Sequence, residues 1–175
     1  MGQYRANTME DRRIRRLREG EWESFRALRL EALRTDPRSF GSSYERESAY
    51  PAEKWKGWAD GSATGQDQAT FVAEDPSGRW IGMVGVFAHE QRPHIWGMWV
   101  HPAHRGRGVG GALLNACLRW IDTAFPPGET LLEVNPEVEA AVRTYRSAGF
   151  EFNGVTVPLG HWEPETLAHQ MVRKP

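Results

Sequence analysis

Apolar residues recur along this chain at two spacings, and each spacing predicts a different element. Residues 95–100 read IWGMWV, an apolar and mostly β-favouring run that predicts a buried strand. Pro102 cannot continue a strand ladder, so we expect this strand to end near His101. From Val109 onward the apolar residues lie three and four positions apart, which is typical of an amphipathic helix. A strand, a glycine-rich turn and a helix therefore follow one another in the middle of the chain.

The same two spacings, and the turn residues between them, predict elements along the rest of the sequence. Strands are expected at residues 12–18, 69–74, 80–88, 95–100, 130–135, 150–157 and 167–172. Helices are expected at residues 21–33, 51–58, 109–125 and 137–148, and loops at residues 61–68 and 158–166. The order is β-α-α-β-β-β-α-β-α-β-β. It predicts an α/β (α+β) fold, with a central mixed, mostly antiparallel sheet of about seven strands and helices on both faces.

Length and charge limit the organisation of the chain and its partners. The 175 residues suffice for one core, and we expect a flexible N-terminal tail at residues 1–11 followed by a single domain at residues 12–175. The formal net charge of −1 provides no overall field that would attract nucleic acid or an anionic membrane. Residues 12–18 hold five arginines, but without interleaved aromatic residues this run favours an exposed edge strand over nucleic-acid binding.

Cysteine and histidine spacing argues against disulfides and metal sites. Cys117 is the one cysteine, which excludes a disulfide framework, and it lies on the apolar side of the predicted helix. None of the six histidines forms an H-x-x-x-H pair, so we expect no metal site. The sequence shows no signal peptide and no apolar run of about 18 residues. We therefore expect a soluble, cytoplasmic protein.

The turn at residues 105–111, RGRGVGG, holds four glycines and two arginines. Such a turn at a helix start leaves backbone N–H groups free beside the positive end of the helix dipole, where phosphate binds. A P-loop is excluded because no Lys-Ser or Lys-Thr pair follows the glycines. Gly106, Gly108 and Gly111 match the dinucleotide pattern G-x-G-x-x-G. However, five residues separate Val100 from these glycines, and too few residues follow for a doubly wound sheet.

A third pattern in this turn is R-x-x-G-x-G, formed by Arg105, Gly108 and Gly110. It resembles the pyrophosphate loop of the GNAT superfamily of N-acetyltransferases. The preceding W-V-H-P and the following G-A-L-L are also similar to that family's strand and helix. A second stretch, LEVN at residues 132–135 followed by Tyr145 and then Gly-Phe, resembles the family's L-E-V-N … A-x-x-x-Y-x-x-x-G-F segment.

The resemblance covers residues 69–155 and implies the GNAT fold with acetyl-CoA as cosubstrate. In that fold two parallel strands splay apart, and the thioester lies in the gap between them. The strand backbone pairs with the pantetheine arm, and the loop amides hold the pyrophosphate. The cofactor-binding residues implied in this way are Met98, Trp99, Val100, Arg105, Gly106, Arg107, Gly108, Val109, Gly110, Gly111, Asn135 and Tyr145.

Two catalytic residues follow from the same resemblance. Tyr145 is placed to protonate the leaving thiolate, and a buried structural tyrosine is the alternative. An amine must be neutral to attack, so a base is also needed. Glu133 matches a glutamate that serves as base in some GNAT enzymes acting on protein N-termini, while a solvated or salt-bridged role is the alternative. Glu90, His89 and His94 are rival bases.

The acceptor side is implied by position within the family pattern. Phe40, Tyr44 and Trp162 are expected to bind substrate in a partly aromatic pocket that suits an apolar or cation-bearing acceptor. Packing of these rings against the core is the alternative. The sequence also departs from the family: Val138 replaces a frequent asparagine that contacts pantetheine, and Thr144 replaces a leucine.

The implied function is transfer of the acetyl group of acetyl-CoA to a primary amine by direct attack in a ternary complex. The acceptor is an amine-bearing small molecule or a peptide or protein N-terminus, and fold-level analogy does not fix which. We expect neither nucleic acid nor membrane as a partner, and a homodimer is left open. Two other functions also stay open: a catalytically silent acyl-CoA-binding regulatory module and an NAD-dependent oxidoreductase.

Overall fold

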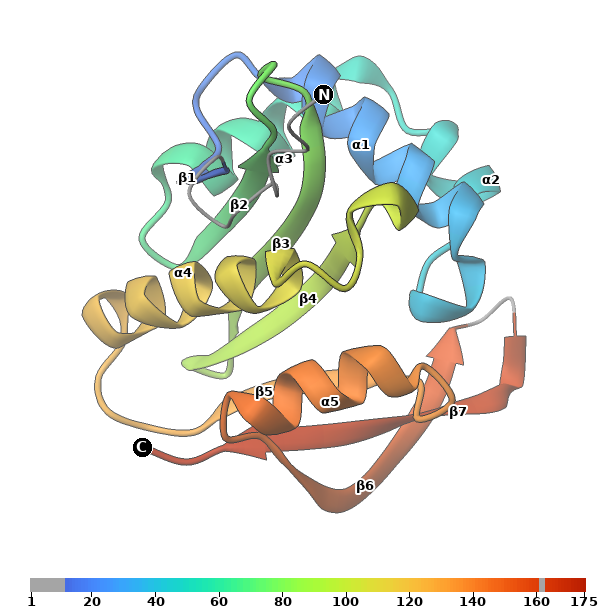
Figure 1. The fold of residues 1–175 in the computed structure, drawn as a ribbon, viewed down its shortest axis with the longest axis vertical. Coiled ribbons are helices and arrows are strands. Elements are labelled where there is room, and N and C mark those ends of the chain that lie inside the picture. The colour runs from blue at the N-terminus through green and yellow to red at the C-terminus, as the bar shows by residue number, and fades with distance from the viewer. Residues whose placement is uncertain (1–11, 161–162) are drawn as a thin grey trace, which may run out of the picture.

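A computed structural model describes residues 12–160 and 163–175, which form one sheet covered by helices (Figure 1). The strands are β1 (Arg13–Arg16), β2 (Gln68–Glu74), β3 (Trp80–His89), β4 (Arg92–Val100), β5 (Thr130–Val134), β6 (Glu151–Gly160) and β7 (Glu163–Arg173). The helices are α1 (Trp22–Thr35), α2 (Tyr44–Ser48), α3 (Ala52–Thr64), α4 (Val109–Ala124) and α5 (Glu139–Ser147), with 3₁₀ turns η2 (Pro37–Ser39) and η3 (Pro102–His104). Every predicted strand and helix corresponds to one of these elements.

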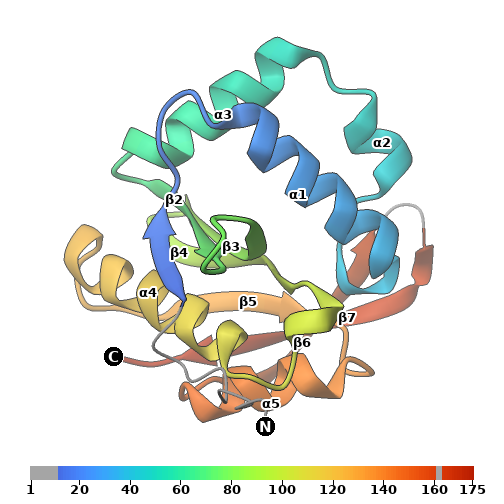
Figure 2. The same cartoon turned by 45° about the horizontal axis from the view of Figure 1, so that its top comes forward.

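The seven strands form one mixed sheet in the order β1-β2-β3-β4-β5-β7-β6. Every neighbouring pair is antiparallel except β4 and β5, which run parallel. A parallel pair needs a crossover connection, and α4 provides it by packing across one face of the sheet (Figure 2). The expected mixed, mostly antiparallel sheet is confirmed.

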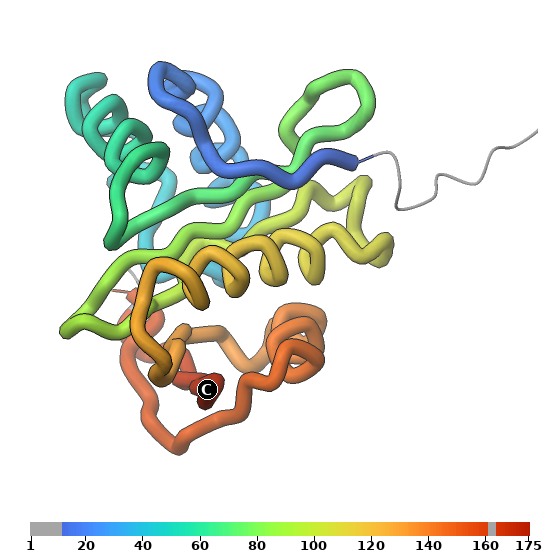
Figure 3. Tube along the Cα trace, turned by 90° about the vertical axis from the view of Figure 1, so that its left-hand side faces the viewer, coloured from blue at the N-terminus to red at the C-terminus, as the bar shows by residue number. Residues whose placement is uncertain are grey.

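Helices cover both faces of the sheet, as expected, and side chains along β2 alternate between the two layers. Phe71 and Ala73 belong to the core beneath α4 and α5, whereas Val72 belongs to the core beneath α1 and α3. Figure 3 shows α1 and α3 on one side of the N-terminal strands and α4 on the other.

Among the described residues, no helix is long and apolar enough to cross a membrane.

Strand β4 carries one extra residue at Gly97. Met83 of β3 pairs with Trp99, and Gly85 pairs with Trp96, so three steps along β4 lie opposite two steps along β3. Gly97 takes up the extra residue with a φ of +64°, a left-handed conformation that side-chain-bearing residues rarely adopt. This geometry is that of a β-bulge, which bends its strand and increases the local twist.

The bulge lies where β4 leaves β5. His94 pairs with Leu131 and Ile95 pairs with Leu132, and within the described ranges the two strands make no further pairs. Beyond Ile95 the edge of β4 is therefore not covered by a neighbouring strand. The sheet opens between its two halves at this point.

A buried ion pair between α1 and α2 packs against the bulge in β4. Arg29 donates through Nε and Nη2 to the two carboxylate oxygens of Glu47, at 2.9 and 2.8 Å. The two side chains are 6% and 4% exposed, so each charge depends on the other for its compensation. The guanidinium lies over the rings of Phe40 and Trp96, and its Nη1 would lie 3.3 Å from a β-carbon on Gly97.

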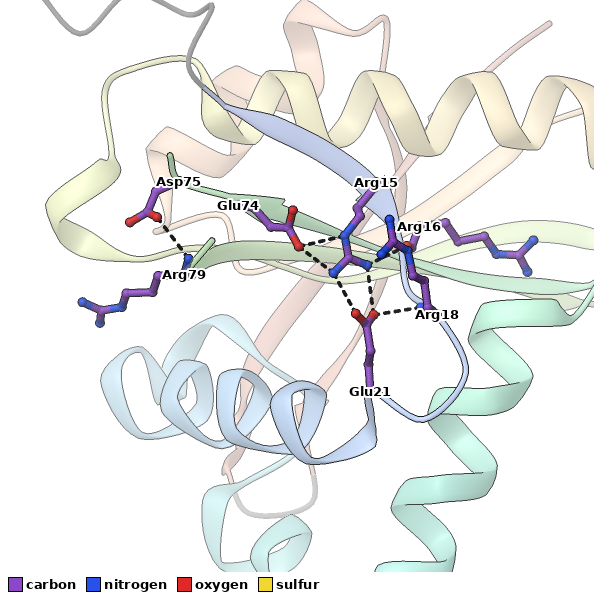
Figure 4. Close-up of polar contacts among 7 residues, drawn as sticks. All are labelled: Arg15, Arg16, Arg18, Glu21, Glu74, Asp75 and Arg79. Atoms are coloured by element: carbon purple, nitrogen blue, oxygen red, sulfur yellow. Dashed lines mark hydrogen bonds and ion pairs between the residues drawn. The ribbon is translucent and has the colours of Figure 1, made fainter. Parts of the chain in front are cut away.

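The basic run at residues 12–18 is tied to protein groups. Arg15 lies between Glu21 and Glu74, with hydrogen bonds of 2.8 and 2.9 Å to the first carboxylate and 2.7 Å to the second (Figure 4). Arg16 donates to the backbone carbonyls of Ser62 in α3 and Gln68 at the start of β2. The expected edge position of β1 is confirmed, but most of its residues are half-buried because these contacts cover them.

Two helical segments extend beyond the sequence prediction. Residues 40–50, which have no clean period, contain α2, and Ser43 caps it by accepting a backbone N–H. A helix of one turn is too short for a periodic pattern to reveal. Helix α3 runs on to Thr64, past the end expected near residue 58. Burial of Ala59 and Ser62 outweighs the cost of about 1 kcal/mol for a glycine inside the helix.

The loop expected at residues 158–166 is wrong for most of its length. β6 continues to Gly160 and pairs there with the start of β7, and Pro158 pairs with Leu167. A proline usually ends a strand, but β6 is at the edge of the sheet, where a missing N–H can face away from the ladder. Residues 161–162, including the predicted substrate residue Trp162, lie outside the described residues.

The bulge gives a stability prediction. In Gly97→Ala the new methyl group would contact Arg29 Nη1, and alanine would have to adopt the left-handed conformation that glycine has here. The free energy of unfolding should therefore fall by about 1–2 kcal/mol. Gly57→Ala in α3 is the matched control, because nothing lies within 4 Å of its added carbon. Alanine should raise stability there by up to about 1 kcal/mol. Denaturant unfolding measures both changes, and equal effects would contradict the strained bulge.

Candidate active site

A cavity of about 440 Å³ lies where the sheet opens. Its walls are the end of β4, the glycine-rich turn with the start of α4, the end of β5, and α5. The predicted cofactor residues that line it are Met98, Trp99, Val100, Arg105, Gly106, Gly108, Val109, Gly110, Gly111, Asn135 and Tyr145. Of that predicted set, Arg107 alone does not line the cavity. Two segments more than 20 residues apart in the sequence thus meet around one space.

The glycine-rich turn has the backbone geometry of an anion cradle. Gly106 and Gly108 have φ values of +70° and +78°, and Gly108 caps the start of α4. The first N–H groups of a helix have no partner within it, so those of α4 are free to bind a ligand. A β-carbon on Gly110 would point between Val100 and Thr144, 3.7 and 3.9 Å from their methyl groups. Glycine there keeps the passage between β4 and α5 open.

Asp36 joins the glycine-rich turn to the end of α1. Its carboxylate accepts a hydrogen bond from Trp99 Nε1 at 2.7 Å and forms an ion pair with Arg105. Arg105 also donates to the backbone carbonyl of Val100 at 2.9 Å. Asp36 and Ser39 line the cavity, which places η2 at its wall. The sequence patterns did not single out Asp36 as a site residue.

The side chain of Asn135 is used within the protein. Its Nδ2 donates to the carbonyl of Arg38 at 3.0 Å, and its Oδ1 accepts from the N–H of Glu137 at 3.0 Å. Asn135 is 2% exposed. The residue lines the cavity, and these two hydrogen bonds hold η2 against β5.

Tyr145 on α5 is buried beside the cavity and is 6% exposed. Its ring packs edge-on against Phe150, with ring centroids 6.0 Å apart. Burial raises the pKa of the phenol far above its usual value, and the neighbouring Cys117 thiol adds to the effect. The phenol therefore stays protonated at all physiological pH values and can donate a hydrogen bond or a proton.

Glu133 is half-buried at the end of β5 and also lines the cavity. Burial opposes ionisation of its carboxylate, but hydrogen bonds from His94 and Gln170 outweigh that effect and hold the pKa below its usual value. The carboxylate is therefore ionised at neutral pH. Among the rivals, Glu90 is 73% exposed and faces Arg92 at 3.7 Å. Neither Glu90 nor His89 lines the cavity.

The structure places the predicted substrate residues Phe40 and Tyr44 away from the cavity. Phe40 is 4% exposed and packs in the core beneath Arg29. Tyr44 lies under the guanidinium of Arg34, 4.3 Å from it. Trp96 lines the cavity instead.

Within the described part of the chain, no group of three histidine, cysteine or carboxylate side chains is arranged to hold a metal ion. The cavity holds the buried phenol of Tyr145 and the carboxylate of Glu133, and the glycine-rich turn forms another part of its wall.

Known proteins resemble this chain in sequence and in fold. Streptothricin acetyltransferase from Streptomyces lavendulae is 33% identical over 110 residues, which span 57% of this chain and 58% of that protein. A GNAT-family acetyltransferase from Streptococcus pneumoniae superposes with a TM-score of 0.77 at 20% identity, over 93% of this chain and 98% of its own. Spermidine N-acetyltransferase from Vibrio cholerae, crystallised with CoA and spermine, gives 0.71 at 18% identity over 93% and 95%.

At these low identities the two solved structures show a shared fold. The family assignment comes from the sequence match, because the model of the acetyltransferase (GNAT) family covers residues 15–150, well over half of the chain. The chain belongs to the acetyltransferase (GNAT) family.

Proposed function

We propose that this protein transfers the acetyl group of acetyl-CoA to a primary amine on a small molecule or peptide, by direct attack in a ternary complex. The observation that carries the proposal is the cavity between β4 and β5, around which the anion cradle, a protonated phenol and an ionised carboxylate lie. Membership of the acetyltransferase family supports the same activity.

Each wall of the cavity has a distinct task in this reaction. Acetyl-CoA supplies an acetyl group activated as a thioester. The N–H groups at the start of α4 hold the pyrophosphate. The uncovered edge of β4 beyond Ile95 hydrogen-bonds the pantetheine arm as an added strand would, and one of its N–H groups polarises the thioester carbonyl. Glu133 takes a proton from the amine, directly or through a water, and Tyr145 gives one to the departing thiolate.

The acceptor enters from the side formed by η2 and Trp96. Glu133 places a carboxylate on the cavity wall, to which Trp96 adds an aromatic ring, and this environment suits a cationic amine. The structurally similar protein from Vibrio cholerae is a spermidine N-acetyltransferase, and its amine substrate supports an amine acceptor for this protein. A panel of polyamines, amino acids, amino sugars and peptides, assayed by release of free CoA thiol, tests the proposal. CoA binding without turnover on any of them would favour the silent regulatory module.

Gly110→Asp tests the cofactor cradle. Aspartate suits the first turn of a free helix, and its β-carbon meets only ordinary contacts, so the variant should fold. Its carboxylate would face the pyrophosphate, and like charges at this range should weaken acetyl-CoA binding at least about tenfold. Gly110→Ala is the control for bulk alone. Calorimetric titration measures both affinities, and wild-type affinity in the aspartate variant would refute this placement of the pyrophosphate.

Tyr145→Phe tests the acid. The ring contact with Phe150 is kept while the O–H is lost, so kcat should fall by about one to two orders of magnitude. The acetyl-CoA Kd should change less than about threefold, because the loss acts on the leaving group. Single-turnover rates isolate the chemical step. If the chemical step in Tyr145→Phe runs at the wild-type rate, Tyr145 has a structural role and is not the acid.

A further inference from the structure

Two side chains from neighbouring strands hold Glu133. His94 Nε2 on β4 contacts Oε2 of the carboxylate, and Gln170 Nε2 on β7 donates to Oε1 at 2.9 Å. Gln170 is itself fixed, because its Oε1 accepts a hydrogen bond of 2.7 Å from Asn153 on β6. Both carboxylate oxygens are therefore engaged by a polar cluster that spans four adjacent strands.

Strand register brings these side chains together at the point where the sheet opens. His94 pairs with Leu131 across the short parallel ladder. Glu133 lies two residues beyond Leu131 and therefore on the same face of β5. Gln170 is directly opposite Glu133 in the antiparallel pairing of β5 with β7. The cluster thus lies where the pairing of β4 with β5 ends and the gap begins.

His94 and Glu133 differ in their access to the cavity. Glu133 lines the cavity and His94 does not. The Nε2 atom of His94 faces the carboxylate, and its Nδ1 is buried with no hydrogen-bond partner. The ring stacks on Phe87, with an interplanar angle of 8° and centroids 5.3 Å apart. Neither ring nitrogen can meet an incoming amine, which excludes His94 as the group that touches the substrate.

We propose that His94, together with Gln170, is a positioning residue for Glu133. Their two N–H groups hold the carboxylate at the cavity wall and keep it ionised when an amine arrives. This inference rests on the proposed function, because it assumes that Glu133 takes the amine's proton.

The two hydrogen bonds from His94 and Gln170, which together we call the clamp, stabilise the charged form of the Glu133 carboxylate. Burial disfavours the charge, and the hydrogen bonds from His94 and Gln170 more than compensate, so the pKa of Glu133 is lowered. The titratable groups that face the carboxylate are His94 on β4 and, farther away, His89 on β3, while Gln170 is uncharged. A neutral imidazole with its proton on Nε2 is sufficient, since it donates to Glu133 and leaves only an acceptor at the buried Nδ1.

The first test measures the carboxylate itself and needs no catalysis. NMR titration of ¹³C-labelled glutamate side chains, with Glu133 assigned by comparison with Glu133→Gln, gives the titration midpoint. His94→Phe keeps a flat ring against Phe87 but removes the donor, so the midpoint should move to higher pH. His94→Gln carries an N–H at about the reach of Nε2 and should restore the midpoint toward wild type. Gln170→Leu removes the other donor and should also raise it.

His169→Phe is the matched control. It makes the same chemical change next to Gln170 on β7, but His169 faces the opposite side of the sheet and packs edge-on against Phe152. The midpoint should stay at the wild-type value in this variant. A wild-type midpoint in folded His94→Phe and Gln170→Leu, or a shift equal to theirs in His169→Phe, would overturn the proposal.

The second test is kinetic. In His94→Phe we expect kcat at neutral pH to fall about tenfold, a part of the full effect of a general base. The acidic limb of its pH profile should move to higher pH, while the acetyl-CoA KM changes less than about twofold. His94→Gln should recover both the rate and the limb. A uniform loss of rate with an unmoved limb would overturn the proposal. If wild-type protein acetylates no amine, the proposed function fails, and the NMR titration still decides whether the clamp exists.

Discussion

The structure depends on one irregularity in the sheet, the extra residue that Gly97 inserts into β4. Strands β4 and β5 begin side by side and pair at two positions only, and the bulge then turns β4 away from its partner. A regular strand would have continued the ladder and filled the space with side chains. Because it does not, an uncovered strand edge, a helix start and the face of α5 surround one cavity. The cavity therefore lies where the ladder between β4 and β5 ends.

An opening in a sheet costs paired backbone groups and packed area, so the surrounding contacts have to stabilise it. The buried pair of Arg29 and Glu47 supports the bulge from the side of α1 and α2. Asp36 connects α1 to β4 and to the glycine-rich turn, and Asn135 connects η2 to β5. These polar contacts join elements on different sides of the cavity.

The surroundings of Tyr145 and Glu133, which both line the cavity, shift the pKa values of these two groups in opposite directions. Tyr145 lies in an apolar environment that disfavours the phenolate, whereas Glu133 receives two hydrogen bonds that favour the carboxylate. Their pKa values move apart, one upward and one downward. Such a separation supports the proposed roles of Tyr145 as the acid and Glu133 as the base, since each group rests in the protonation state from which it would act.

The sequence by itself determined the order of elements, the glycine-rich turn and the positions of Tyr145 and Glu133, because these depend on local spacing and on turn chemistry. It also gave the edge position of β1. It did not reveal the helix α2, the length of the β6–β7 hairpin or the contacts of Asp36. Those depend on burial and on partners distant in the chain, which no local pattern encodes. The tertiary structure alone decided that Phe40 packs in the core, that Asn135 holds η2, and that His94 and Gln170 meet Glu133. The physical reason is strand register, because it is set by the whole sheet and brings together residues that the sequence keeps more than 35 positions apart.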